Sequence, residues 1–106
     1  MSYRFMRMLV MFDLPTETGE DKRNYRIFRK ALLKNGFFML QESVYCRLLL
    51  TPSSESVARN AVSSAKPPKG LVQLLCVTEK QFAKMTYLVG THHSEVIDSD
   101  ERVVIL

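Results

Sequence analysis

An apolar run of eight residues near the start of the chain is the feature that most restricts its fold. Residues 5–12 read Phe-Met-Arg-Met-Leu-Val-Met-Phe, and Asp13 follows directly. The run is too short for a typical helix and too continuous for a strand with one face in water. It therefore predicts a central strand covered on much of both faces. Arg4 and Arg7 within the first twelve residues, and the lack of a small-residue cleavage site, argue against a signal peptide.

Residues 18–36 carry the signals of an amphipathic helix. Thr18, followed three residues later by Asp21, is typical of a capping box, and Gly36 is the usual left-handed residue after a helix end. The predicted buried side consists of Tyr25, Phe28, Ala31 and Leu32. The opposite side is cationic, with Leu33 as the one apolar intruder, and consists of Lys22, Arg23, Arg26, Arg29, Lys30 and Lys34.

The order of the remaining elements predicts the fold class. Residues 37–40 and 44–49 are β-prone and form a hairpin or one long bent strand. Thr51-Pro52 opens a second helix, and residues 71–77 are a further strand. The buried stripe of that helix is predicted to be Val57, Ala58, Ala61, Val62 and Ala65. Strand, helix, strand, strand, helix, strand is the order of an α+β ferredoxin-like βαββαβ sandwich.

A chain of 106 residues has the length of a single domain, so we expect residues 1–106 to form one, with its core in about 1–78. In the remainder, 79–84 are expected to form a short helical turn, 85–89 a strand, and 103–106 an apolar end. We expect segment 103–106 to form an additional C-terminal strand that pairs along a sheet edge, and a second copy could offer that edge in a homodimer. The alternative is a frayed tail. No run approaches the length of a membrane span.

Charge is unevenly distributed along the chain. The formal net charge is +4, but it is +7 through Tyr87 and −3 from Leu88 onward. The basic part predicts a polyanionic partner, and the acidic tail predicts a protein contact. The six cations of the first helix are followed by no acidic residue until Glu42, so we favour contact with a duplex phosphate backbone over a solvated helix face. Four more cations could extend this surface, namely Arg47, Arg59, Lys66 and Lys69.

Asp13 is the main candidate for chemistry. A carboxylate at the end of a buried strand needs compensation, which loop amides or a helix cap can give, or which a divalent cation can give. Mg²⁺ is bound through one or two carboxylates and substrate phosphate. One Asp is a poor site in a monomer, but a two-fold axis near the strand end would bring two copies of Asp13 together. This arrangement predicts a metal on or near the dimer axis.

Other catalytic patterns are weak. His92 and His93 are adjacent and have no ligand at a zinc-binding interval. Cys46 and Cys76 lie in separate apolar runs and indicate buried thiols of a reducing cytosol, neither a disulfide framework nor a nucleophile. Tyr45 and Ser43 could neighbour Asp13 and orient water or substrate, although packing or hairpin roles are the simpler interpretation.

The ordered combination of these segments resembles the Cas-two family of CRISPR adaptation proteins, particularly the short members found beside single-effector (type II) systems. The resemblance covers nearly the whole chain. It is carried by Met11-Phe12-Asp13-Leu14-Pro15, Tyr25-Arg26-Ile27-Phe28-Arg29-Lys30 with Leu33, Gly36-Phe37, and Gln41-Glu42-Ser43-Val44-Tyr45.

The resemblance implies a ferredoxin-like homodimer whose C-terminal strands cross to the partner. It implies that Asp13 is catalytic and binds a divalent metal, Mg²⁺ or Mn²⁺, in an endonuclease acting on RNA or duplex DNA in the bacterial cytoplasm. It also implies a scaffold between dimers of the adaptation integrase during spacer acquisition, a role for which catalysis by this protein is dispensable because the integrase performs strand transfer. Two alternatives are a VapD-like toxin ribonuclease and a non-catalytic ferredoxin-like binding module.

Overall fold

The strand β1 (Met6–Asp13) has a neighbour on each side in a four-stranded antiparallel sheet of order β2-β3-β1-β4. The computed structural model describes residues 5–91. Along the chain, the other elements are α1 (Gly19–Lys34), β2 (Phe38–Gln41), β3 (Val44–Leu49), α2 (Pro52–Ala65), β4 (Leu71–Thr78) and α3 (Glu79–Ala83). This order and topology confirm the α+β ferredoxin-like fold.

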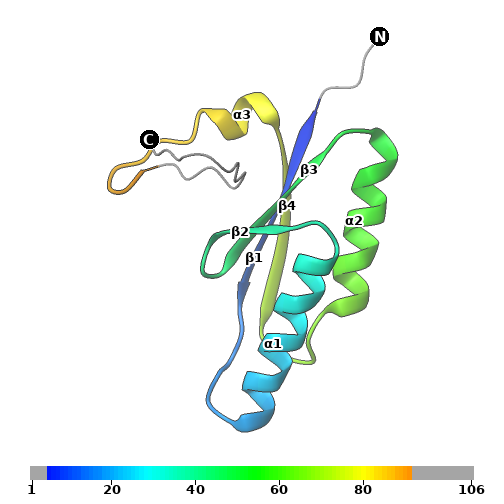
Figure 1. The fold of residues 1–106 in the computed structure, drawn as a ribbon, viewed down its shortest axis with the longest axis vertical. Coiled ribbons are helices and arrows are strands. Elements are labelled where there is room, and N and C mark those ends of the chain that lie inside the picture. The colour runs from blue at the N-terminus through cyan, green and yellow to red at the C-terminus, as the bar shows by residue number, and fades with distance from the viewer. Residues whose placement is uncertain (1–4, 92–106) are drawn as a thin grey trace, which may run out of the picture.

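The two faces of β1 are buried to different degrees. Met8, Val10 and Phe12 are buried, whereas the side chains between them are only partly covered. Successive side chains of a strand point to opposite faces, so one face of the sheet packs into the core and the other is more open. Figure 1 shows α1 and α2 lying side by side along the sheet and α3 at one end of it. The sequence predicted that both faces of β1 would be largely covered. Within residues 5–91, only the face with Met8, Val10 and Phe12 is fully covered.

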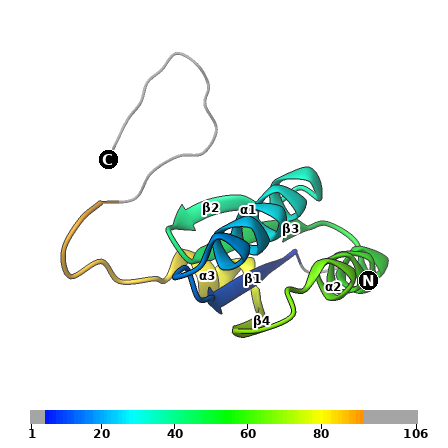
Figure 2. The same ribbon diagram turned by 90° about the horizontal axis from the view of Figure 1, so that it is seen from below.

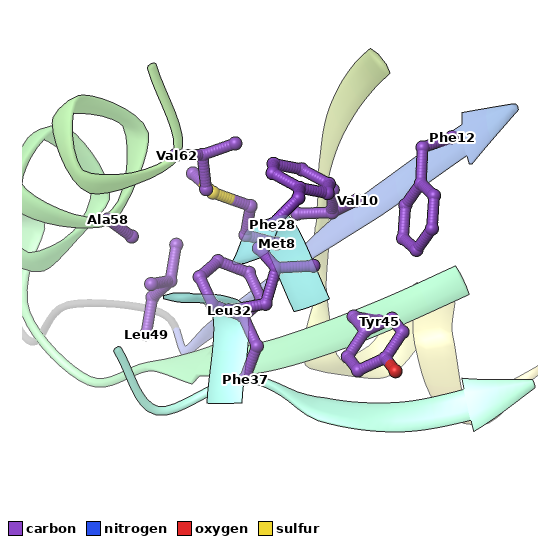
Figure 3. Close-up of a cluster of buried hydrophobic side chains, with 10 residues drawn as sticks. All are labelled: Met8, Val10, Phe12, Phe28, Leu32, Phe37, Tyr45, Leu49, Ala58 and Val62. Carbon is purple, nitrogen blue, oxygen red and sulfur yellow. The ribbon is translucent and has the colours of Figure 1, made fainter. Parts of the chain in front are cut away.

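The core lies between the sheet and the helices α1 and α2. Phe28 and Leu32 of α1 and Ala58 and Val62 of α2 meet the buried side chains of the strands (Figure 3). Phe12 lies edge-on to Phe28, with ring centroids 5.2 Å apart. The residues of this cluster are Met8, Val10, Phe12, Phe28, Leu32, Phe37, Tyr45, Leu49, Ala58 and Val62.

The predicted helix ends are confirmed. Thr18 Oγ1 accepts from the Asp21 amide at 3.0 Å, and Asp21 Oδ2 accepts from the Thr18 amide at 3.3 Å, which completes the capping box. These hydrogen bonds hold the pKa of the Asp21 carboxyl below its usual value, and the one from the Thr18 amide has the largest effect. Thr51 precedes α2 with Pro52 at its first turn. Gly36 follows α1 with φ of 88°.

Two residues are more exposed than the helical patterns predict. Val57, expected in the buried stripe of α2, is 58% exposed. Ile27 is 50% exposed on α1, so Leu33 is not the only apolar residue among the basic ones. Both lie at the margin of a helical stripe, where the curvature of the helix turns a side chain away from the sheet.

Residues 37–49 form a hairpin rather than one long bent strand. The short helical turn is confirmed as α3, but the strand expected at residues 85–89 is wrong. Figure 2 shows the chain after α3, coloured orange, running away from the sheet. Leu88 and Val89 are almost fully exposed there, and a strand requires a neighbour for its backbone hydrogen bonds. His92, His93 and residues 103–106 lie outside the described residues. No helix in the described part of the chain is long and apolar enough to span a bilayer.

Candidate functional site

Asp13 is the last residue of β1 and pairs with Leu71 of β4. Its side chain is exposed. By strand alternation it lies on the sheet face opposite the buried Phe12, the face that α1 and α2 leave uncovered. Among residues 5–91, no cluster of three or more His, Cys, Asp or Glu side chains could hold a metal. At this position one protomer offers the Asp13 carboxylate but no cluster of three ligands among the described residues.

Tyr45 does not extend this site through its side chain. Tyr45 pairs with Val10 and is fully buried, so it lies on the core face of the sheet, opposite Asp13. The backbone carbonyl of Ser43 accepts from the Phe12 amide at 3.0 Å. Tyr45 is thus a packing residue, which confirms its simpler interpretation, and Ser43 lies in the hairpin turn with its backbone bonded to Phe12.

The basic side of α1 is exposed along the whole helix. All six predicted cations are exposed, and none makes an ion pair within residues 5–91. Unpaired cations at helical spacing are free to contact successive phosphates. We call this surface the basic stripe; it consists of Lys22, Arg23, Arg26, Arg29, Lys30 and Lys34.

The four cations considered as extensions are placed differently. Arg59 Nη2 pairs with Glu55 Oε2 at 2.6 Å, which raises the pKa of the guanidinium. Lys69 Nζ lies 3.4 Å from Asp21 Oδ1, and Arg47 Nη1 donates to the Asn35 carbonyl at 3.1 Å. Lys66 is exposed at the end of α2. Three of the four are thus committed to contacts within the protomer.

Most side chains of the sheet face that carries Asp13 are apolar, although Arg7 and Gln73 lie on the same face. Leu71 and Leu75, on the edge strand β4, are 53% and 50% exposed there. Apolar side chains gathered on one exposed face are common at sites of interaction with other molecules. We call this surface the open face; it consists of Leu9, Met11, Leu48, Leu71 and Leu75.

An ion pair that joins α3 to the same side of the sheet was missed by the sequence reasoning. Arg7 donates to both carboxylate oxygens of Glu79, from Nε at 2.6 Å and from Nη2 at 3.1 Å. Its guanidinium also lies 4.5 Å from the centroid of the Phe82 ring. The pKa of Arg7 is raised, chiefly by the hydrogen bonds to Glu79. A cation inside an apolar strand requires a partner, so the position of Arg7 in the sequence could have predicted an ion pair.

Comparison with known proteins gives consistent matches. Residues 6–85, which span β1 through α3, match the sequence model of the family described as CRISPR associated protein Cas2. The chain is 46% identical over 101 residues to a CRISPR-associated endoribonuclease Cas2 of Treponema denticola, with 95% of this chain and 100% of that protein covered. It is 48% identical over 101 residues to one of Streptococcus mutans, with 95% and 93% covered. A third, from Lacticaseibacillus rhamnosus, is 45% identical over 101 residues, with 95% and 100% covered.

Proposed function

This chain belongs to the Cas2 family of CRISPR-associated proteins, and from that premise we propose that it is a metal-dependent endonuclease with Asp13 as its catalytic residue. Relatives of nearly the same length are named endoribonucleases, which supports RNA as a substrate. The observation that carries the proposal is the place of Asp13. It is an exposed carboxylate at the end of the central strand, on the sheet face that α1 and α2 leave uncovered.

The residues present fit a hard divalent cation in a shared site. Asp13 supplies one carboxylate per protomer, and Mg²⁺ or Mn²⁺ is commonly held by one or two carboxylates together with water and substrate phosphate. When bound, such an ion stabilises negative charge on a phosphoryl oxygen and makes water more acidic. The part played by this chain is to hold the Asp13 carboxylate at a fixed position and to bind the flanking phosphates through cationic side chains.

The active form in this proposal is a homodimer joined through the open face. A two-fold interface uses the same patch of both copies, and an apolar sheet face is self-complementary in this way. Because Asp13 lies at the margin of that face, an axis passing near the end of β1 brings the two copies of Asp13 together. The same contact removes Leu71 and Leu75 from water.

The scaffold role follows from the basic stripe. The six cations of the basic stripe make no ion pair within residues 5–91, so they can contact the phosphates of duplex DNA. A dimer carries two such stripes. We also propose that this dimer holds duplex DNA between dimers of the adaptation integrase in the bacterial cytoplasm. Family membership favours this role over the toxin and binding-module alternatives.

Replacing Asp13 tests the catalytic proposal. The variant Asp13→Asn keeps the shape of the side chain and removes its charge, so it should bring Mg²⁺- or Mn²⁺-dependent cleavage of labelled RNA and duplex DNA down to the rate without protein. The dimer should remain folded by circular dichroism. Glu17→Gln is the matched control, because it removes one exposed carboxylate from the loop that follows β1.

Cleavage that persists at equal purity in Asp13→Asn would place the activity in another residue or a contaminant. Equal loss in Glu17→Gln would indicate a general effect of charge in this loop. Binding of an integrase and a short duplex, measured with the same variants, separates the two roles, since the scaffold role predicts that Asp13→Asn still assembles.

A further inference from the structure

The loop between α2 and β4, residues 66–70, packs against the chain segment that leaves β1. Gly70 is the contact point. A Cβ atom built on it would lie 2.7 Å from Leu14 Cδ2, 2.9 Å from the Asp13 carbonyl oxygen and 3.2 Å from Leu14 Cα. Two of these three neighbours are main-chain atoms, which cannot rotate away as a side chain can.

The conformation of Gly70 also excludes other residues. Its φ is +101°, a region that L side chains rarely adopt. The remaining positive-φ glycines of the described residues have no comparable contact. Gly36 has φ of +88° but would meet only the flexible side chain of Arg47, at 3.5 Å, and Gly90 would meet nothing within 4 Å. A close approach to the main chain therefore distinguishes Gly70.

The rest of the loop holds this contact in place. Pro67 and Pro68 restrict its backbone, and Lys69 pairs with Asp21 in the first turn of α1. Between the loop and the start of α1 there remains only a cavity of about 10 Å³. The next residue, Leu71, is the β-sheet partner of Asp13. Asp13 is thus held on one side by its partner strand β4, and the main chain just after it is held by the 66–70 loop.

We propose that Gly70 is a positioning residue for Asp13: its lack of a side chain lets the 66–70 loop press directly on the Asp13 and Leu14 main chain and so fixes the direction of the Asp13 carboxylate. This inference rests on the proposed function of Asp13. A Cβ atom 2.9 Å from the Asp13 carbonyl oxygen is closer than real Cβ atoms approach, so the loop and the Asp13 main chain must shift relative to each other. Displacement of groups that orient a metal ligand typically weakens metal affinity by about 10- to 100-fold.

The test compares Gly70→Ala with Gly36→Ala, which places the same methyl group on another positive-φ glycine, away from Asp13. Mn²⁺ binding is measured by electron paramagnetic resonance without nucleic acid, and Asp13→Asn defines which part of the binding belongs to Asp13. We expect Gly70→Ala to weaken that part by about tenfold or more. It should lower kcat for cleavage with KM for RNA nearly unchanged. Gly36→Ala should lower the thermal midpoint without changing either quantity.

If Gly70→Ala does not accumulate as folded protein, Pro67→Gly together with Pro68→Gly loosens the loop without adding atoms. The Asp13-dependent part of Mn²⁺ binding should weaken in this variant too, at unchanged circular dichroism. Mn²⁺ affinity and kcat that match those of Gly36→Ala would overturn the inference. Equal Mn²⁺ binding by the wild type and Asp13→Asn would instead overturn the proposed metal site, so the two failures are distinguishable.

Discussion

In Tyr45, the packing of the ring conflicts with the hydrogen-bonding requirement of its hydroxyl group. Its ring is fully buried and packs 5.7 Å from the centroid of Phe12, but its hydroxyl oxygen is buried without a hydrogen-bond partner among the described residues. Figure 3 shows that this oxygen points away from the other side chains of the cluster. The ring therefore stabilises the core, while the hydroxyl costs free energy because it has lost water.

We expect Tyr45→Phe to leave the free energy of unfolding unchanged or to raise it by up to about 1 kcal/mol, since it removes the unpaired group and keeps the ring. Urea denaturation of the purified protein measures this. Tyr45→Ala serves as the control and should cost about 3–5 kcal/mol through the cavity it leaves. A loss above about 1 kcal/mol in Tyr45→Phe would mean that the hydroxyl has a partner in the assembled protein.

At the scale of elements, α1 carries two functions on its two sides. Phe28 and Leu32 hold the helix on the sheet, and the basic stripe on the other side is free of ion pairs within residues 5–91. Because stability and binding use different residues, the cations can be removed without unfolding the helix. Ala has a higher helix propensity than Arg or Lys, so the replacement also preserves the helix itself.

Replacing Arg23, Arg26 and Lys30 together by Ala should weaken duplex DNA binding and flatten its dependence on salt. Each phosphate contact that is lost lowers the slope of log K against log salt by about 0.9. Fluorescence anisotropy with a labelled duplex at several salt concentrations gives the slope. The control replaces Lys80 and Lys84, two exposed cations outside the basic stripe, by Ala. An equal change of slope per replaced cation in the two variants would mean that net charge alone explains the effect.

At the scale of the whole molecule, one face of the sheet is filled by two helices and the other is left apolar and only partly covered. α3 covers part of it, held there by the Arg7–Glu79 pair. Leu71 and Leu75 remain exposed beside it. A small domain with such a face gains stability when a second copy covers it, because apolar area leaves water.

We expect Leu75→Glu to raise the dissociation constant of the homodimer by about 100-fold or more, since a carboxylate would be buried at the interface without a partner. Sedimentation velocity over a concentration series measures this. Val57→Glu is the control, because Val57 is equally exposed but lies on α2, on the opposite side of the sheet. A wild type that stays monomeric at all concentrations would refute the homodimer, and with it the shared metal site.

The sequence by itself determined the order of the elements through α3 and the caps of the helices, while the role of Asp13 stays a prediction. Order and caps depend on short-range physics: the helical period and the hydrogen bonds between Thr18 and Asp21. The six cations of α1 were assigned to one exposed side for the same reason, since neighbours within a helix lie close in the chain. The cost of a desolvated carboxylate, which singled out Asp13 in the sequence, does not apply in the protomer, because the Asp13 side chain is exposed.

The tertiary structure decided which groups meet across the chain. Strand register placed Asp13 on the open face and Tyr45 on the core face, and a shift by one residue would have exchanged them. Arg7 and Glu79 are 72 residues apart, and the contact of Gly70 with Asp13 joins the 66–70 loop to the end of β1. Residues 85–89 lacked a strand neighbour despite their apolar pattern. Such contacts are set by how packed elements align in space, which local propensity and periodicity do not encode.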